Sequence, residues 1–146
     1  MPESIQFLGR SRFLDANRRK EIRALLSYIA ESHNFIISSL VYIHMTDNEL
    51  LEVNQTHLNH DTYTDIITFD LSDSEGVLDG EIYVSTDRIK ENAVTYQSDF
   101  WTEYVRVISH GVFHLLGYGD KTENESKTMR DKELQAIGRW LSLRST

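Results

Sequence analysis

The sequence contains no cysteine, and its single proline stands at position 2. Without cysteine the chain can form no disulfide framework, and any metal site must use histidine, aspartate or glutamate. No apolar run approaches the ~20 residues that a membrane-spanning helix needs, so we expect no membrane association. The N-terminal segment also lacks the basic start and apolar core of a secretory signal. These absences favour a cytoplasmic protein.

The chain has no excess of basic residues either, since its formal net charge is -8 at pH 7. Proteins that bind nucleic acid without specificity usually carry a basic excess, so the charge argues against that class. It does not exclude a local basic groove. Six basic residues cluster in one segment: Arg10, Arg12, Arg18, Arg19, Lys20 and Arg23. The plainer interpretation of this cluster is a solvated helix face.

The 146 residues, of which 40% are hydrophobic and 26% charged, fit one globular domain spanning positions 1–146. The periodicity of apolar residues predicts strands at about 4–8, 35–44, 65–71 and 80–85. It predicts helices at about 16–32, 86–96, 100–116 and 124–143, and a short one that starts at the capping box formed by Thr46 and Glu49. We therefore expect an α+β fold, in which about five helices pack on a mixed sheet of about four strands. The last two strands should form an antiparallel hairpin across the polar turn at 73–80.

The stretch HGVFHLLGYGD, residues 110–120, has the spacing of a metal site. His110 and His114 are four residues apart on a predicted helix, so their rings share one face and can reach one ion. Gly117 can adopt a positive φ and let the chain turn back, which allows Asp120 to supply a third ligand. Two histidines on a helix are also common without a metal. The added Gly117 and Asp120, however, match the spacing of zincin-type zinc sites.

The helical wheel supports this interpretation. The apolar side of the helix is formed by Trp101, Tyr104, Val105, Ile108, Val112, Leu115 and Leu116. At about 100° per residue the two histidines lie roughly opposite that stripe, on a face shared with Glu103 and Arg106. The helix can thus bury one side while its histidines face a cleft. Three protein ligands would leave a fourth position for water, as in catalytic zinc sites.

The residue after the first histidine argues against a peptidase. Zinc peptidases place a glutamate there as general base, in the motif H-E-x-x-H. Here that position is Gly111, which has no side chain. A nucleobase deaminase is disfavoured because its cysteine ligands are missing.

At these residues the chain resembles the YbeY family of metal-dependent endoribonucleases and rRNA maturation factors. The family signature is similar to H-G-x-L-H-L-x-G-Y-D-H with an E…M…E tail, and this chain has HGVFHLLGYGD followed by Glu125, Met129 and Glu133. A second family block resembles VNQTHLNHDTYTDIITF, with matches at Asn54, Asp61, Thr64, Asp65 and Phe69. A G-(D/E)-I strand matches Gly80, Glu81 and Ile82.

The resemblance implies a single-domain α+β fold with a zincin-like metal helix and one zinc ion. It also implies cleavage of single-stranded RNA, maturation of the 3′ end of 16S rRNA and ribosome quality control. The implied partners are 16S rRNA and the small ribosomal subunit.

Two positions depart from the family pattern. Asp120 stands where the family usually has a histidine ligand; a carboxylate makes the site more negative and suits harder ions. Leu58 stands where the family usually has an arginine, which would be a natural partner for phosphate. His60 is our candidate for a phosphate contact or proton donor, the alternative being a surface histidine in a loop.

Three acidic residues have open interpretations. Asp65 is a candidate to hydrogen-bond a ligand histidine and orient it. Glu125 and Glu133 either hold the loop by hydrogen bonds or are solvated helix residues. Two alternatives to the nuclease also stay open: another metallohydrolase, or a ribosome-assembly factor with a structural metal.

Overall fold

The computed structural model describes residues 4–60 and 62–144, and within them the chain forms four strands and five helices. The strands are β1 (Ile5–Gly9), β2 (Ile36–Met45), β3 (Ile66–Asp70) and β4 (Val77–Ser85). The helices are α1 (Ala16–Ser32), α2 (Asp47–Leu58), α3 (Thr86–Thr95), α4 (Phe100–Leu115) and α5 (Glu123–Arg144). The predicted α+β class and order of elements are confirmed.

The four strands form one mixed sheet in the order β1-β2-β4-β3. The pairs β1–β2 and β2–β4 are parallel. β3 runs antiparallel to β4, with Phe69 opposite Glu81, so the predicted hairpin is also confirmed. β3 is thus an edge strand of the sheet, and it contacts α4.

The start of β4 differs from our prediction, because the strand begins at Val77 and not at Gly80. Val77 pairs with Ile36 of β2, and Leu78 is buried. We assigned these residues to the polar turn at 73–80. The glycine instead marks a close approach within the sheet: a Cβ atom there would lie 2.8 Å from the Phe69 carbonyl oxygen.

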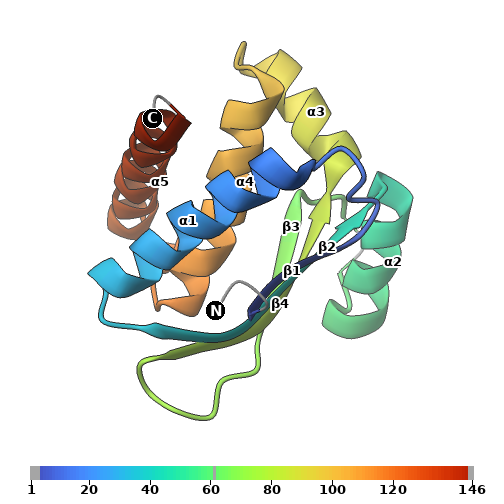
Figure 1. Cartoon of the computed structure of the whole chain (residues 1–146). Helices are drawn as coiled ribbons and strands as arrows, with labels where there is room; N and C mark the ends of the chain where they lie inside the picture. Colours follow the sequence, from blue (N-terminus) through green and yellow to red (C-terminus); the bar gives the residue numbers. More distant parts are fainter. Residues whose placement is uncertain (1–3, 61, 145–146) are drawn as a thin grey trace.

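The helices lie in layers around the sheet (Figure 1). α1 and α4 cover one face, and α5 packs outside them against both. α2 contacts β2 and β4 from the opposite side. The core lies between the sheet and the α1–α4 layer, where Leu25, Tyr42, Ile82 and Ile108 are all fully buried. Among the described residues, no helix is both long and apolar enough to cross a bilayer.

The basic cluster near the start of α1 is packed and paired. The Arg18 guanidinium lies 4.2 Å from the ring centroid of Trp101, and that of Arg23 lies 5.1 Å from the ring of Phe7. Arg10 forms an ion pair with Glu49 at 2.9 Å. These three arginines thus have partners within the fold, whereas the plainer interpretation was a solvated helix face.

His44 on β2 is a buried histidine outside the predicted site, with a side chain that is 1% exposed. Its Nδ1 lies 3.1 Å from the Leu8 carbonyl oxygen, to which it donates, so its Nε2 accepts the hydroxyl proton of Tyr104 at 2.7 Å. Burial lowers the pKa of His44 from 6.5 to about 4. The imidazole therefore stays neutral in the folded chain at pH values where an exposed histidine is protonated.

We expect His44 to make the fold sensitive to mild acid. Because its folded pKa lies below the unfolded value, the unfolded state binds more protons between those two values, and stability falls as the pH drops through this window. The loss in the free energy of unfolding should approach ~3 kcal/mol at the lower end of this pH window. Urea unfolding at pH 7 and pH 5 measures it, with His44→Gln expected to flatten the dependence and exposed His57→Asn expected to preserve it. A His44→Gln chain with the wild-type pH dependence would contradict this account.

Candidate metal centre

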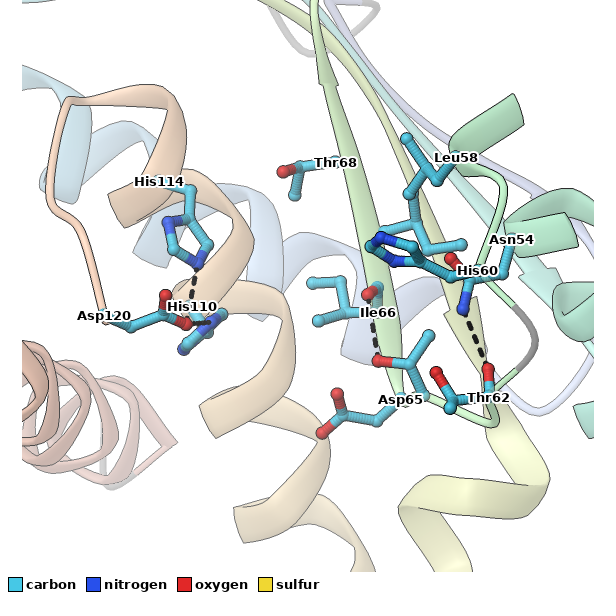
Figure 2. Close-up of a pocket in the computed structure, with 12 residues that line it drawn as sticks. Asn54, Leu58, His60, Thr62, Asp65, Ile66, Thr68, His110, His114 and Asp120 are labelled. Atoms are coloured by element: carbon cyan, nitrogen blue, oxygen red, sulfur yellow. Dashed lines mark hydrogen bonds and ion pairs between the residues drawn. The ribbon is translucent and has the colours of Figure 1, made fainter.

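Helix α4 brings the two predicted histidine ligands together. The rings of His110 and His114 have centroids 4.4 Å apart and are nearly perpendicular, at 83°. Gly117 has a φ of 109° and turns the chain back at the end of α4, as predicted. Asp120 Oδ2 then lies 3.4 Å from His110 Nε2 and 3.3 Å from His114 Nε2 (Figure 2). One ligand atom from each of the three residues fits within 4.8 Å of the others.

The other ring nitrogen of each histidine has its own acceptor. His114 Nδ1 lies 2.9 Å from the Tyr118 carbonyl oxygen, and a carbonyl can only accept, so Nδ1 carries the hydrogen. His110 Nδ1 lies 2.6 Å from Glu133 Oε2. Both bonds select the same tautomer, in which the Nε2 lone pair points toward Asp120.

This arrangement would be repulsive by itself. Two nitrogen lone pairs and a carboxylate oxygen converge on one point, and none of the three atoms brings a hydrogen when both imidazoles are neutral. A cation at that point would convert the repulsion into attraction. The donor set, two imidazoles and one carboxylate, is one that divalent metals such as zinc accept. His110, His114 and Asp120 are therefore the residues that could hold a metal.

His110 contacts a buried network of charged side chains. Glu133 of α5 is only 4% exposed, and its Oε1 lies 3.4 Å from Arg106 Nη1 while its Oε2 meets His110. The Arg106 guanidinium also contacts Glu103 at 2.6 Å and Asp65 at 3.4 Å. Burial lowers the pKa of Arg106, but the hydrogen bond and charge of Glu103 outweigh it and raise the pKa overall. One guanidinium therefore faces three carboxylates.

The structure does not bear out the candidate role of Asp65, and Glu133 fits neither of the two interpretations that we left open for it. Asp65 forms its ion pair with Arg106, whereas the carboxylate that bonds a ligand histidine is that of Glu133. The reason is the position of α5, which packs against α4 and brings Glu133 to His110 from 23 residues away. The family-like E…M…E tail was the only sequence signal for this contact.

The rest of that tail anchors the loop that holds Asp120. Glu125 Oε1 accepts the backbone N–H groups of Lys121 at 3.2 Å and Thr122 at 3.0 Å, so it holds the loop, one of our two interpretations. These bonds lower the pKa of Glu125. The Ser126 hydroxyl donates to the Asp120 carbonyl at 2.9 Å. Met129 is buried in the core.

The three candidate ligands line a cleft of about 480 Å³. The opposite wall comes from the end of α2 and the segment after it, and includes Leu58 and His60. Figure 2 shows the His60 ring on that wall, pointing into the cleft. Asn54 holds this segment by donating to the Thr62 carbonyl at 2.8 Å. The structure thus places His60 across the cleft from the histidine pair, while Asp61 lies outside the described residues.

Gly111 has a packing reason to be glycine. A Cβ atom there would lie 2.9 Å from Ile66 Cδ1 and 3.1 Å from Ile82 Cγ2, so α4 rests directly on the sheet at this position. A larger side chain at this position, including the glutamate of zinc peptidases, would collide with these two isoleucines unless α4 moved away from the sheet.

Comparison with known proteins shows which family the chain is similar to. The family model described as "Endoribonuclease YbeY" matches residues 7–140. An "Endoribonuclease YbeY" of Cytophaga hutchinsonii is 44% identical over 131 residues, covering 90% of this chain and 92% of the relative. One from Christiangramia forsetii is 40% identical over 133 residues, covering 91% and 92%. A solution structure from Thermotoga maritima, 29% identical, has a TM-score of 0.65 and covers 94% of this chain and 92% of its own.

The charge network leads to a stability prediction. Replacing Arg106 with methionine leaves the buried carboxylates of Glu103 and Glu133 without their shared cation. We expect a loss of roughly 3 kcal/mol in the free energy of unfolding, measured with urea at pH 7. The matched control is Arg10→Met, which breaks an exposed ion pair with Glu49 and should leave the free energy of unfolding almost unchanged. Equal losses in the two variants would contradict a buried network at Arg106.

Proposed function

Because the chain belongs to the YbeY endoribonuclease family, we propose that it is a metal-dependent nuclease that hydrolyses single-stranded RNA in the cleft beside α4. The observation that carries the proposal is the convergence of His110 Nε2, His114 Nε2 and Asp120 Oδ2 at one point, with the hydrogens of both imidazoles directed elsewhere. The proposal assigns these three residues as the metal ligands.

Zinc is the metal that we propose. Ligand atoms at about 2.0–2.1 Å from a tetrahedral zinc ion lie about 3.3–3.4 Å from one another. The distances from Asp120 Oδ2 to the two Nε2 atoms are 3.4 and 3.3 Å. The nitrogen-rich donor set also favours zinc over magnesium or calcium.

The chemistry that such an ion supplies when bound is activation of water and polarisation of a phosphoryl oxygen. The chain's own residues prepare the site for it. Glu133 and the Tyr118 carbonyl fix the imidazole tautomers, and the Glu125 bonds hold the loop of Asp120. From the opposite wall, His60 is proposed to hydrogen-bond a phosphate oxygen or to give a proton to the leaving oxygen.

The shape of the site favours a catalytic metal over a structural one. Structural zinc sites usually have four protein ligands, whereas catalytic sites keep a position open. Among the described residues, the group that could hold a metal comprises three members, and it borders a cleft. Gly111 disfavours the peptidase alternative because its position faces the sheet.

Leu58 distinguishes this cleft from the family pattern. It lines the wall near His60, and its side chain is 40% exposed. The cleft therefore presents an apolar side chain where the family pattern has an arginine, and His60 is the remaining group on that wall that can carry a positive charge. We propose that His60 contributes part of the phosphate contact that the arginine would make.

The proposed substrate within this class is ribosomal RNA, specifically the 3′ end of 16S rRNA. The proposed partner is the small ribosomal subunit, with a role in rRNA maturation and ribosome quality control in the cytoplasm. Family membership supports these assignments.

The central prediction concerns His114→Ala. The purified wild-type chain should contain one zinc ion per chain by mass spectrometry of the metal, and should cleave a fluorescent single-stranded RNA. His114→Ala should lose the metal and at least about 100-fold in cleavage rate while keeping its circular dichroism spectrum. His57→Ala, also a histidine on a helix, is the control and should behave as wild type. Wild-type activity in a His114→Ala sample without metal would overturn the proposal.

The role of His60 is tested separately. His60→Asn should lower kcat by about 10- to 100-fold, the range of one hydrogen bond to a charged group, without changing the zinc content. Exposed His57→Asn on α2 is the matched control. An unchanged kcat in His60→Asn would show that this histidine is a surface residue of the loop.

A further inference from the structure

A second cavity lies on the other side of the metal-binding loop, between the C-terminal end of α1, the end of α4 and α5. Its volume is about 540 Å³. The residues that line it include Tyr28, His33, Phe113, Tyr118, Lys132 and Arg139. This lining combines three aromatic rings with two permanent cations, and none of these residues carries a carboxylate. The cavity is therefore cationic in a chain whose net charge is -8.

The two cations of the cavity are held over aromatic rings. Lys132 Nζ lies 5.6 Å from the ring centroid of Tyr118, and the Arg139 guanidinium lies 4.2 Å from that of Tyr28. Among the described residues, neither cation forms an ion pair with a carboxylate, in contrast to Arg106. Their charges are thus available to an anionic ligand, and the rings already define where they sit.

Tyr118 is fixed in place at the back of this cavity. His33 Nδ1 donates to the Ile29 carbonyl at 2.8 Å, so His33 Nε2 accepts the Tyr118 hydroxyl proton at 2.8 Å. The Tyr118 ring also packs edge-on against Phe113, with centroids 5.7 Å apart. A ring held on several sides is a preorganised surface for stacking.

The cavity and the metal cleft share their dividing wall. Phe113 faces the cavity and the next residue, His114, faces the cleft. The Tyr118 carbonyl accepts the His114 Nδ1 hydrogen, while the Tyr118 ring lines the cavity. On α5, Lys132 lines the cavity and the next residue, Glu133, bonds His110. The end of α4, the loop after it and the middle of α5 thus separate the two sites.

We propose that this second cavity binds a nucleotide of the same single-stranded RNA whose scissile phosphodiester lies in the metal cleft. Lys132 and Arg139 contact its phosphates, and a base stacks on the tyrosine rings, with Gln135 and Ser32 as polar contacts at the rim. Cations combined with aromatic platforms are the usual means of binding single-stranded nucleic acid without sequence preference. The inference rests on the proposed function, because it names a second contact for that substrate.

The test is RNA binding by two charge-matched double variants of α5. Lys132→Gln/Arg139→Gln removes the two cations of the cavity. Lys127→Gln/Arg130→Gln removes two cations from the same helix at exposed positions that do not line it. Fluorescence anisotropy measures the Kd of a labelled RNA of about 12 nucleotides, within the range of sites for single strands. Metal-loaded protein is used throughout with a phosphorothioate-linked RNA, which keeps the charge of the backbone but slows cleavage, and circular dichroism checks folding.

The cavity variant should bind at least 5-fold more weakly than wild type, and the control variant should bind as wild type does. The slope of log K against log salt should become shallower by about 1.4 in the cavity variant, since each lost phosphate contact on a single strand contributes about 0.7. Equal effects of the two variants, or no effect of the cavity variant, would overturn the inference.

A third variant, Tyr28→Leu, covers the case in which the double substitution disturbs folding. It should weaken RNA binding without changing the salt slope, because a ring contributes stacking and no charge. An unchanged Kd in Tyr28→Leu would contradict the stacking role. Absence of cleavage by the metal-loaded wild-type chain would count against the proposed function, while the binding measurements would still report on the cavity.

Discussion

The hydrogen bond between Glu133 and His110 is the interaction on which the candidate site depends. Its length of 2.6 Å and the burial of Glu133 describe a charge-assisted bond in a dry environment. Burying a carboxylate there is tolerable because Arg106 lies beside it. The bond fixes which nitrogen of His110 faces the cleft, so a contact between α4 and α5 sets the chemistry of a site that neither helix could make alone.

The packing of α4 on the sheet provides the second constraint. Gly111 lets the helix approach Ile66 and Ile82, and this places the residues on either side of it at fixed heights above the sheet. The face of α4 that carries His110 and His114 then lies opposite the wall formed by the segment after α2. The end of α4 also contributes Phe113 to the second cavity, so this helix positions residues of both the metal cleft and the second cavity.

Much of this organisation is local and could be predicted. The spacing of His110, His114, Gly117 and Asp120 depends on helix geometry and one positive φ, and the structure brings those side chains together. Glu133 could not be assigned from spacing, because its position depends on how α5 packs. The partner of Asp65 could not be assigned from spacing either, because Arg106 of α4, about one turn before His110, pairs with its carboxylate. The second cavity is formed by three distant segments, so no single stretch of sequence indicates it.

The proposed ligand set is tested directly by an anomalous-diffraction map of crystals of the zinc-loaded chain, collected on both sides of the zinc edge. We expect one peak per chain, within about 2.0–2.2 Å of His110 Nε2, His114 Nε2 and Asp120 Oδ2, with a water molecule as the remaining ligand. Ligation through Nδ1, a fourth protein ligand at the ion, or a peak away from these three residues would contradict it.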